Sequence, residues 1–255
     1  MSSTKEQLFI LDKFEFEVQP VGIKFSAKKP TNFDRLDKKM ALCEMLKKAQ
    51  DGSTFYADAE NHTCEAGLYV LGQADGLEPF VNGEFGAALK IFEEPRSASR
   101  LYLHISKIER GRVNYIAFSP MNKLSFEPDL LIILANTDQT EILLRATSYR
   151  TGNIWVSKSS AAIGCSWIYI YPYLSGNLNY LTTGLGHGMK RRKLFPQGKH
   201  LISIPYDLLP CVLQTLQEMP WVLPAYKPDG EKFVKESLLE LGIGPAPEIQ
   251  SNKKE

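Results

Sequence analysis

The stretch that decides the fold is residues 128–138, which read PDLLIILANTD. From Leu130 to Leu134 it is continuously apolar, and such a run is typical of a central strand covered on both faces of a sheet. The polar residues at 136–138 can cap a helix, and the pattern predicts that helix from Gln139 to about Tyr149. A buried strand followed directly by a helix indicates the α/β class.

Further strands and helices are predicted on both sides of this unit. Strands are expected near Val21 and Ile202 and at 54–57 and 115–118, while residues 157–171 fit either a helix or a strand. Helices are predicted at residues 38–50, 64–71, 95–108 and 206–218. We therefore expect an α/β fold with a single mixed-sheet domain flanked by helices, or the same domain in two lobes.

The chain is expected to divide into three parts. Residues 1–17 form an N-terminal helical segment, and residues 18–222 form the α/β core domain. Residues 223–255 form a C-terminal extension with one helix and a polar tail, because the sequence turns polar and Pro-rich after Pro220.

The composition excludes several classes of protein. The chain of 255 residues carries 30 Lys plus Arg against 29 Asp plus Glu, and this net charge of +1 argues against a nucleic-acid-binding protein. Charged residues interrupt the apolar residues of the opening segment, so a signal peptide is not expected. The apolar run at 130–134 is far shorter than the ~20 residues of a membrane-spanning helix. We expect a cytoplasmic protein without a membrane partner.

Three cysteines from distant segments are candidate metal ligands. Cys43, Cys64 and Cys165 form no C-x-x-C pair, but thiolates from separate segments can together hold an iron–sulfur cluster or another soft metal. The alternative is three unrelated thiols buried in the core, where free cysteine is often found. Cys211 lies in a predicted amphipathic helix, and we expect it to face the core.

Cys64 is also a candidate nucleophile. It opens a predicted helix, where unpaired backbone N–H groups favour the thiolate form of a cysteine. His62 lies two residues away and is a candidate general base, as is His187. This pattern is compatible with a catalytic pair of Cys64 and His62.

A glycine-rich stretch followed by basic residues is a candidate anion site. Residues 183–193 read TGLGHGMKRRK, in which backbone N–H groups and positive charges can meet a phosphate or carboxylate. The spacing matches neither the dinucleotide fingerprint nor the P-loop. The alternative is a turn with a solvated basic face. The candidate binding residues are Gly184, Gly186, His187, Gly188, Lys190 and Arg191.

Four short segments together carry a resemblance to a known family. They are residues 20–25 (PVGIKF), 43–49 (CEMLKKA), 64–72 (CEAGLYVLG) and 128–132 (PDLLI). In this order they resemble the prokaryotic domain-of-unknown-function family 169, found in archaea and anaerobic bacteria, over roughly residues 18–220. The resemblance implies a cytoplasmic prokaryotic protein and brings no known reaction with it.

The resemblance also concerns the candidate site. Family members carry thiols that match the three cysteines named above and a Gly-x-x-Arg-like loop that matches residues 188–191. Some members have a further thiol in this loop, where this chain has Gly186 or His187. A four-ligand cluster in this protein would therefore need His187 or a ligand from outside the chain.

Three functions follow from these patterns. The first is a cytosolic protein that binds a redox or metal cofactor, such as an iron–sulfur cluster, through the dispersed thiolates, with the basic loop holding a small anionic molecule. The second is a non-catalytic binding or regulatory module for a small molecule. The third is a thiol-dependent enzyme with Cys64 as its nucleophile. The sequence leaves open whether the protein is an enzyme.

Overall fold

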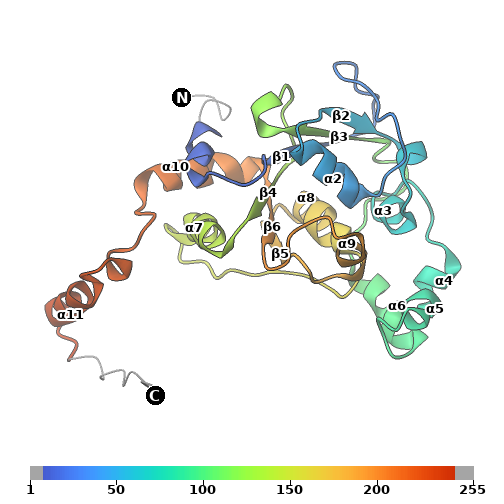
Figure 1. The fold of residues 1–255 in the computed structure, drawn as a ribbon. Coiled ribbons are helices and arrows are strands. Elements are labelled where there is room, and N and C mark those ends of the chain that lie inside the picture. Colours follow the sequence, from blue (N-terminus) through green and yellow to red (C-terminus); the bar gives the residue numbers. More distant parts are fainter. Residues whose placement is uncertain (1–7, 245–255) are drawn as a thin grey trace. The chain divides into compact units, whose positions relative to one another are not determined.

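The computed structural model describes residues 8–244, and its centre is a six-stranded sheet in the order β2-β3-β1-β4-β6-β5 (Figure 1). The strands are β1 (Val21–Ser26), β2 (Phe55–Ala57), β3 (Tyr115–Pro120), β4 (Leu130–Ala135), β5 (Asn179–Thr182) and β6 (His200–Pro205). The expected α/β domain with one sheet flanked by helices is confirmed. All neighbouring strands pair antiparallel, where a mixed sheet was expected. Strand direction depends on the path of the connections, which the apolar pattern of a strand does not record.

Strand β4 lies inside the sheet and organises it. It pairs along its whole length with β6, from Leu130 opposite Pro205 to Ala135 opposite His200. All six of its residues are buried. Alternate side chains of β4 join the main core cluster, and the others face the opposite side of the sheet. The prediction of a strand covered on both faces is confirmed.

Within residues 1–217, helices lie around the sheet (Figure 1). The α-helices are α2 (Leu42–Gln50), α3 (Glu65–Val70), α4 (Glu78–Val81), α5 (Glu84–Ala88), α6 (Pro95–His104), α7 (Thr137–Ser148), α8 (Tyr171–Ser175), α9 (His187–Arg192), α10 (Leu209–Glu218) and α11 (Gly230–Glu240). The 3-10 and π-helical elements are η1 (Leu8–Phe14), η2 (Ala59–Asn61), η3 (Met121–Lys123), η4 (Ser166–Ile170), η5 (Tyr206–Leu208) and η6 (Pro224–Tyr226). Helix α2 and turn η4 share one core cluster with the sheet, and α7 packs against β4 and β6.

The predicted cap of α7 is present. The Asn136 side chain accepts a hydrogen bond from the Gln139 backbone N–H (2.8 Å), and the Gln139 side chain accepts one from the Asn136 N–H (2.9 Å). This reciprocal arrangement satisfies two donors that a helix start leaves unpaired. The helix therefore begins at Thr137, two residues before the predicted start.

Residues 157–171, which fitted either a helix or a strand, are irregular at first and then helical. Their helical part passes into a π-helical turn, η4, a form that recurs at functional sites. Tyr169 of this turn is fully buried, and its hydroxyl donates a hydrogen bond to the Leu42 carbonyl (3.2 Å). This bond joins η4 to the start of α2.

Two compact units make up the chain, residues 1–217 and 218–255. The first contains the sheet and η1, in which Leu8, Ile10, Leu11 and Phe14 are buried, and the second contains α11. Residues 1–7 of the predicted N-terminal helical segment lie outside the described residues. The division expected at residues 17 and 222 stays a prediction. Between residues 8 and 244, no helix combines the length and the apolar character needed to span a membrane.

Gly72 allows the segment after α6 to lie against the end of α3. Its φ angle is +67°, and a Cβ added at this position would be 2.5 Å from the Ile108 carbonyl oxygen. Backbone hydrogen bonds hold the two segments together, from the Ile108 N–H to the Val70 carbonyl (2.9 Å) and from the Gly111 N–H to the Gly72 carbonyl (3.3 Å). Any other residue at 72 would meet both a backbone penalty and a steric clash.

We expect Gly72→Ala to lower the free energy of unfolding by about 2–4 kcal/mol, because a left-handed φ and an overpacked contact each cost on the order of 1–3 kcal/mol. Gly152 has the same φ of +67° with open space around it. Gly152→Ala should therefore cost only about 1–2 kcal/mol. Urea unfolding of both variants measures the difference, and equal losses would contradict the steric explanation.

Candidate functional site

A cavity of about 390 Å³ lies among α3, the group α4–α6 and α9. In Figure 1 the labels of α3, α4, α5, α6 and α9 stand to the right of those of β4 and β6. The residues that line it come from four stretches of the chain, at 63–66, 80–102, 162–163 and 187–192. The cavity therefore joins the predicted Cys64 region to the predicted basic loop, although more than 120 residues separate them.

One wall of this cavity is apolar and is built by the three short helices α4, α5 and α6. Phe80 and Phe85 stack with their ring centroids 4.3 Å apart. Phe85 and Leu89 both line the cavity and are each 41% exposed, so they present apolar surface to it. We call the cavity-lining apolar side chains of α4–α6 the apolar lobe.

Gly83 makes the apolar lobe possible. It caps α5 with a φ of +90°, and an added Cβ would lie 2.0 Å from the Pro95 carbonyl oxygen. Only glycine allows the start of α5 to approach the start of α6 this closely. The tight turn places Phe85 and Leu89 on the cavity side.

A second part of the lining is basic and belongs to α9. His187, Gly188, Arg191 and Arg192 line the cavity. Their spacing places them on one helical face, whereas Lys190 is exposed outside the lining. The Arg192 guanidinium donates a hydrogen bond to the Gly188 carbonyl (3.2 Å), and the His187 backbone N–H donates one to the carbonyl of residue 161 (2.8 Å).

The loop beside this wall contains an unusual backbone conformation. Ile163 lines the cavity with a φ of +58°. Left-handed φ is a genuine outlier for a β-branched residue, and such strain concentrates at functional sites. Ile163 immediately precedes Gly164 and Cys165. A Cβ added on Gly164 would lie 3.4 Å from the Met189 side chain of α9, so this loop packs closely against α9.

The three predicted thiols are neighbours. Burial is the main cause that raises the pKa of Cys43 to about 11, with Arg192 opposing the rise and Cys64 adding to it. Burial also raises the pKa of Cys165, and the nearby Cys64 and Cys43 raise it further. The sulfurs therefore lie close enough to interact, but only Cys64 lines the cavity.

The structure gives no support for a metal centre at these thiols. Across the part of the chain that the structure describes, no group of three or more His, Cys, Asp or Glu side chains could hold a metal ion. Burial favours the neutral thiol at Cys43 and Cys165, whereas a metal needs thiolates. A thiolate-bound metal or iron–sulfur cluster therefore stays a prediction, and the geometry points to another use of Cys64.

The structure separates the predicted loop residues into two sets. His187, Gly188 and Arg191 line the cavity together with Cys64, whereas Gly184, Gly186 and Lys190 do not. The two glycines outside the lining form turns with positive φ angles of 90° and 72°. They shape the entry to α9 rather than contribute to the cavity wall.

His62 lies in the interior and not in the cavity lining. It is 7% exposed, and both ring nitrogens lack a hydrogen-bond partner among the described residues. Burial lowers its pKa to about 4, so the ring is neutral at pH 7. A Cβ built on Gly67 would lie 3.6 Å from its Nδ1 and 4.0 Å from the Cys64 Cβ, so all three residues meet at the start of α3.

Cys211, which we expected to face the core, is an exposed free thiol. The amphipathic pattern places α10 correctly, with Val212 and Leu213 among its buried residues, but residue 211 lies on its outer side. All four cysteines of the chain are free thiols.

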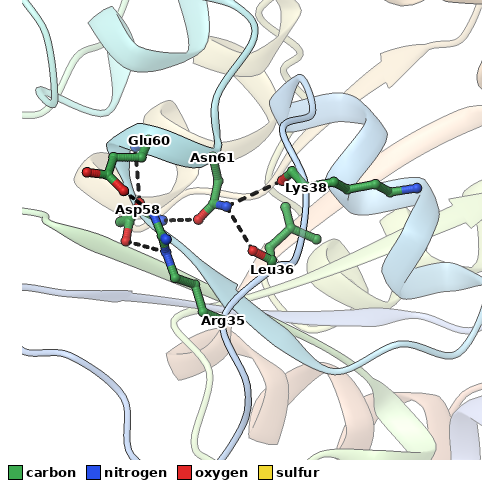
Figure 2. A network of polar contacts seen from close by, with 6 residues as sticks. All are labelled: Arg35, Leu36, Lys38, Asp58, Glu60 and Asn61. Atoms are coloured by element: carbon green, nitrogen blue, oxygen red, sulfur yellow. Dashed lines mark hydrogen bonds and ion pairs between the residues drawn. The ribbon is translucent and has the colours of Figure 1, made fainter.

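A polar network positions the segment that leads into α2 (Figure 2). The Arg35 guanidinium donates to both carboxylate oxygens of Asp58 (2.8 and 2.7 Å) and to Glu60 (2.6 Å). The Asn61 side chain donates to the backbone carbonyls of Leu36 (2.9 Å) and Lys38 (3.3 Å). Burial alone would raise the pKa of Asp58, but Arg35 and the neighbouring N–H donors hold it below its usual value.

This network also places the candidate site. The Met40 N–H donates to the Asn61 carbonyl (2.7 Å), and the Thr63 N–H donates back to the Met40 carbonyl (3.1 Å). The segments before α2 and before α3 are therefore held side by side. Cys43 and Cys64 become neighbours for this reason.

Sequence reasoning missed the apolar lobe and Ile163. The aromatic residues Phe80 and Phe85 near Gly83 were a usable signal, because a short helical segment rich in exposed aromatics often marks a binding surface. The strained backbone at Ile163 has no signal in the sequence. The fold alone determines that conformation.

A family model matches residues 10–215 of the chain, and it is described as the uncharacterised ArCR family, DUF169. The chain belongs to the DUF169 family. The resemblance found in the four short segments is confirmed, and the DUF169 match includes the sheet and every stretch that lines the cavity. A search of curated proteins and a search of solved structures each found no match.

We expect the buried His62 to make this DUF169 protein sensitive to acid. The folded pKa of about 4 lies below the ordinary value of 6.5, so the unfolded chain binds more protons between these two values. The free energy of unfolding should therefore fall by up to about 3 kcal/mol as the pH falls from 6.5 to 4. His62→Phe should remove this part of the decline and leave stability at pH 7.5 unchanged or higher, because no hydrogen bond is lost.

Urea unfolding at a series of pH values measures this effect. The exposed His104 provides a matched control, since His104→Gln should leave the acid dependence as it is in the parent protein. An unchanged acid dependence in His62→Phe would show that His62 is not buried in its neutral form.

Proposed function

We propose that this protein binds a small amphipathic molecule, which has a hydrocarbon part and an anionic group. The observation that carries the proposal is that the apolar lobe and the two guanidinium groups of Arg191 and Arg192 line one cavity. The expected small anionic ligand is retained in this proposal, and its apolar part is added. Such a site suits a binding module and equally a thiol-dependent enzyme.

The charges around the cavity favour an anion. Arginine stays protonated in proteins and can form paired hydrogen bonds to a carboxylate or phosphate. Glu65 also lines the cavity and carries the opposite charge, and it is exposed to solvent, as is Arg191. Two guanidinium groups against one carboxylate leave a positive balance.

The apolar lobe favours a hydrocarbon chain or ring. Burying apolar surface contributes about 25 cal/mol per Å², so a chain that covers Phe85 and Leu89 would gain affinity from both partners. The volume of about 390 Å³ falls within the roughly 300–1,000 Å³ of small-molecule sites. The cavity therefore suits a small ligand or the end of a longer one.

Two other expectations, the cellular location of the protein and a thiolate-bound metal, do not depend on this proposal. Free thiols are typical of a reducing compartment, which supports the cytoplasm as the location of the protein. A thiolate-bound metal is supported only by the proximity of the three thiols, and we give it second place for the reasons of geometry and protonation given above.

Binding of octyl phosphate tests the proposal. We expect isothermal titration calorimetry to show one site, with weaker binding of octanol, which lacks the charge, and of inorganic phosphate, which lacks the chain. Arg191→Gln combined with Arg192→Gln should weaken octyl phosphate binding about tenfold or more, because charge-assisted hydrogen bonds contribute roughly 1.5–3 kcal/mol each.

Lys190→Gln is the control for position, because it removes one positive charge from the same helix outside the cavity lining, where the double arginine variant removes two from within it. It should change the affinity for octyl phosphate less than twofold. Phe85→Asp should weaken binding of both octyl phosphate and octanol. Equal losses in Lys190→Gln and in the double arginine variant would mean that only the general charge of α9 matters and would refute the assigned site.

A further inference from the structure

We infer that Cys64 is an acyl acceptor, and that the ligand of the cavity is an acyl thioester whose carrier part is anionic. This inference rests on the proposed function, because it needs the apolar lobe for the acyl group and the basic wall for the carrier. To the proposed function it adds the chemical class of the ligand, an acyl thioester, and a covalent step at Cys64.

The placement of the thiols singles out Cys64. Among the cysteines, which all lie in the described part of the chain, it alone lines this cavity, and its neighbours at 63, 65 and 66 line it too. Cys43 is buried in the core. The burial that keeps Cys43 and Cys165 protonated makes them poor nucleophiles. A ligand in the cavity therefore meets one thiol.

The two walls match the two ends of an acyl thioester. Phe80, Phe85 and Leu89 offer an apolar surface for the acyl chain, and Arg191 and Arg192 offer charge to a phosphate on the carrier. The reacting carbonyl joins these two parts of the molecule. Because Cys64 belongs to the same lining, the geometry points to attack at that carbonyl.

The step balances without any other reactant. The Cys64 sulfur attacks the thioester carbonyl carbon and forms a new carbon–sulfur bond, and the bond from that carbon to the carrier sulfur breaks. The Cys64 proton passes to the leaving thiolate, so the products are S-acyl-Cys64 and the free carrier thiol. No oxidant, reductant or metal takes part, because one thioester replaces another.

We assign this proton transfer to His187. It lines the cavity with Cys64, whereas the other candidate base, His62, lies in the interior without a place in the lining. An imidazole can take a proton from the thiol and give it to the departing thiolate. We therefore pair Cys64 with His187, in place of the pair of Cys64 and His62 that the sequence suggested.

Octanoyl-coenzyme A tests the inference on the full chain. We expect intact-mass spectrometry to show one octanoyl group per chain, with release of one equivalent of coenzyme A thiol and the label on the peptide that contains Cys64. Cys64→Ser and Cys64→Ala should both lose the label. Cys211→Ser should keep it, although Cys211 is the more exposed thiol.

Octyl-coenzyme A, a thioether that cannot transfer its chain, separates failure of this inference from failure of the proposed function. It should bind the parent protein and both Cys64 variants with affinities within about threefold, which also shows that these variants fold. Binding of the thioether without labelling of Cys64 by octanoyl-coenzyme A would refute the acyl acceptor and leave the proposed function standing. Absence of binding would refute both.

The remaining variants test the roles of the two walls. Arg191→Gln with Arg192→Gln should slow octanoyl transfer about tenfold or more at low thioester concentration. His187→Gln should slow octanoyl transfer by a larger factor than it weakens the affinity for the thioether. Labelling of Cys211 in preference to Cys64 would mean reaction with any exposed thiol and would overturn the inference.

Discussion

Burial of β4 on both faces is the constraint on which the rest of the structure depends. A strand whose six residues are all buried needs a partner strand on each side and a helical layer on each face. β1 and β6 supply the partners, and the chain must return from distant segments to provide them. Asp129, next to this strand, accepts hydrogen bonds from Lys24 (2.6 Å) and from the Phe25 N–H (2.7 Å), which ties the start of β4 to β1.

The layer that contains α2 and η4 determines where the thiols lie. These elements share one core cluster, to which Cys43 on α2 belongs and against which Cys165 at the start of η4 packs. The Arg35–Asp58 ion pair and the backbone bonds between Met40 and Thr63 bring α3 to the same place. Tight packing keeps two thiols protonated and leaves Cys64 at the cavity wall. One burial pattern therefore accounts both for the proximity of the thiols and for their different surroundings.

Much of the fold could be predicted because its signals are local. The apolar run of β4, the Asn136 cap and the strands near Val21 and Ile202 depend on residues adjacent in sequence. The short strand β5 was missed, because its four residues alternate only twice and follow a turn. The antiparallel order was also missed, since strand direction is a property of the whole chain path.

The candidate site shows the same limit. Residue types determined that Cys64 is a possible nucleophile and that Arg191 can meet an anion, because thiol and guanidinium chemistry belong to the side chains themselves. Only the tertiary structure decided that these two share a cavity, that His187 rather than His62 lines it, and that short helices near Gly83 form its apolar wall. Contacts between segments more than 100 residues apart arise from the packing of many elements against β4, and no local pattern in the sequence encodes them.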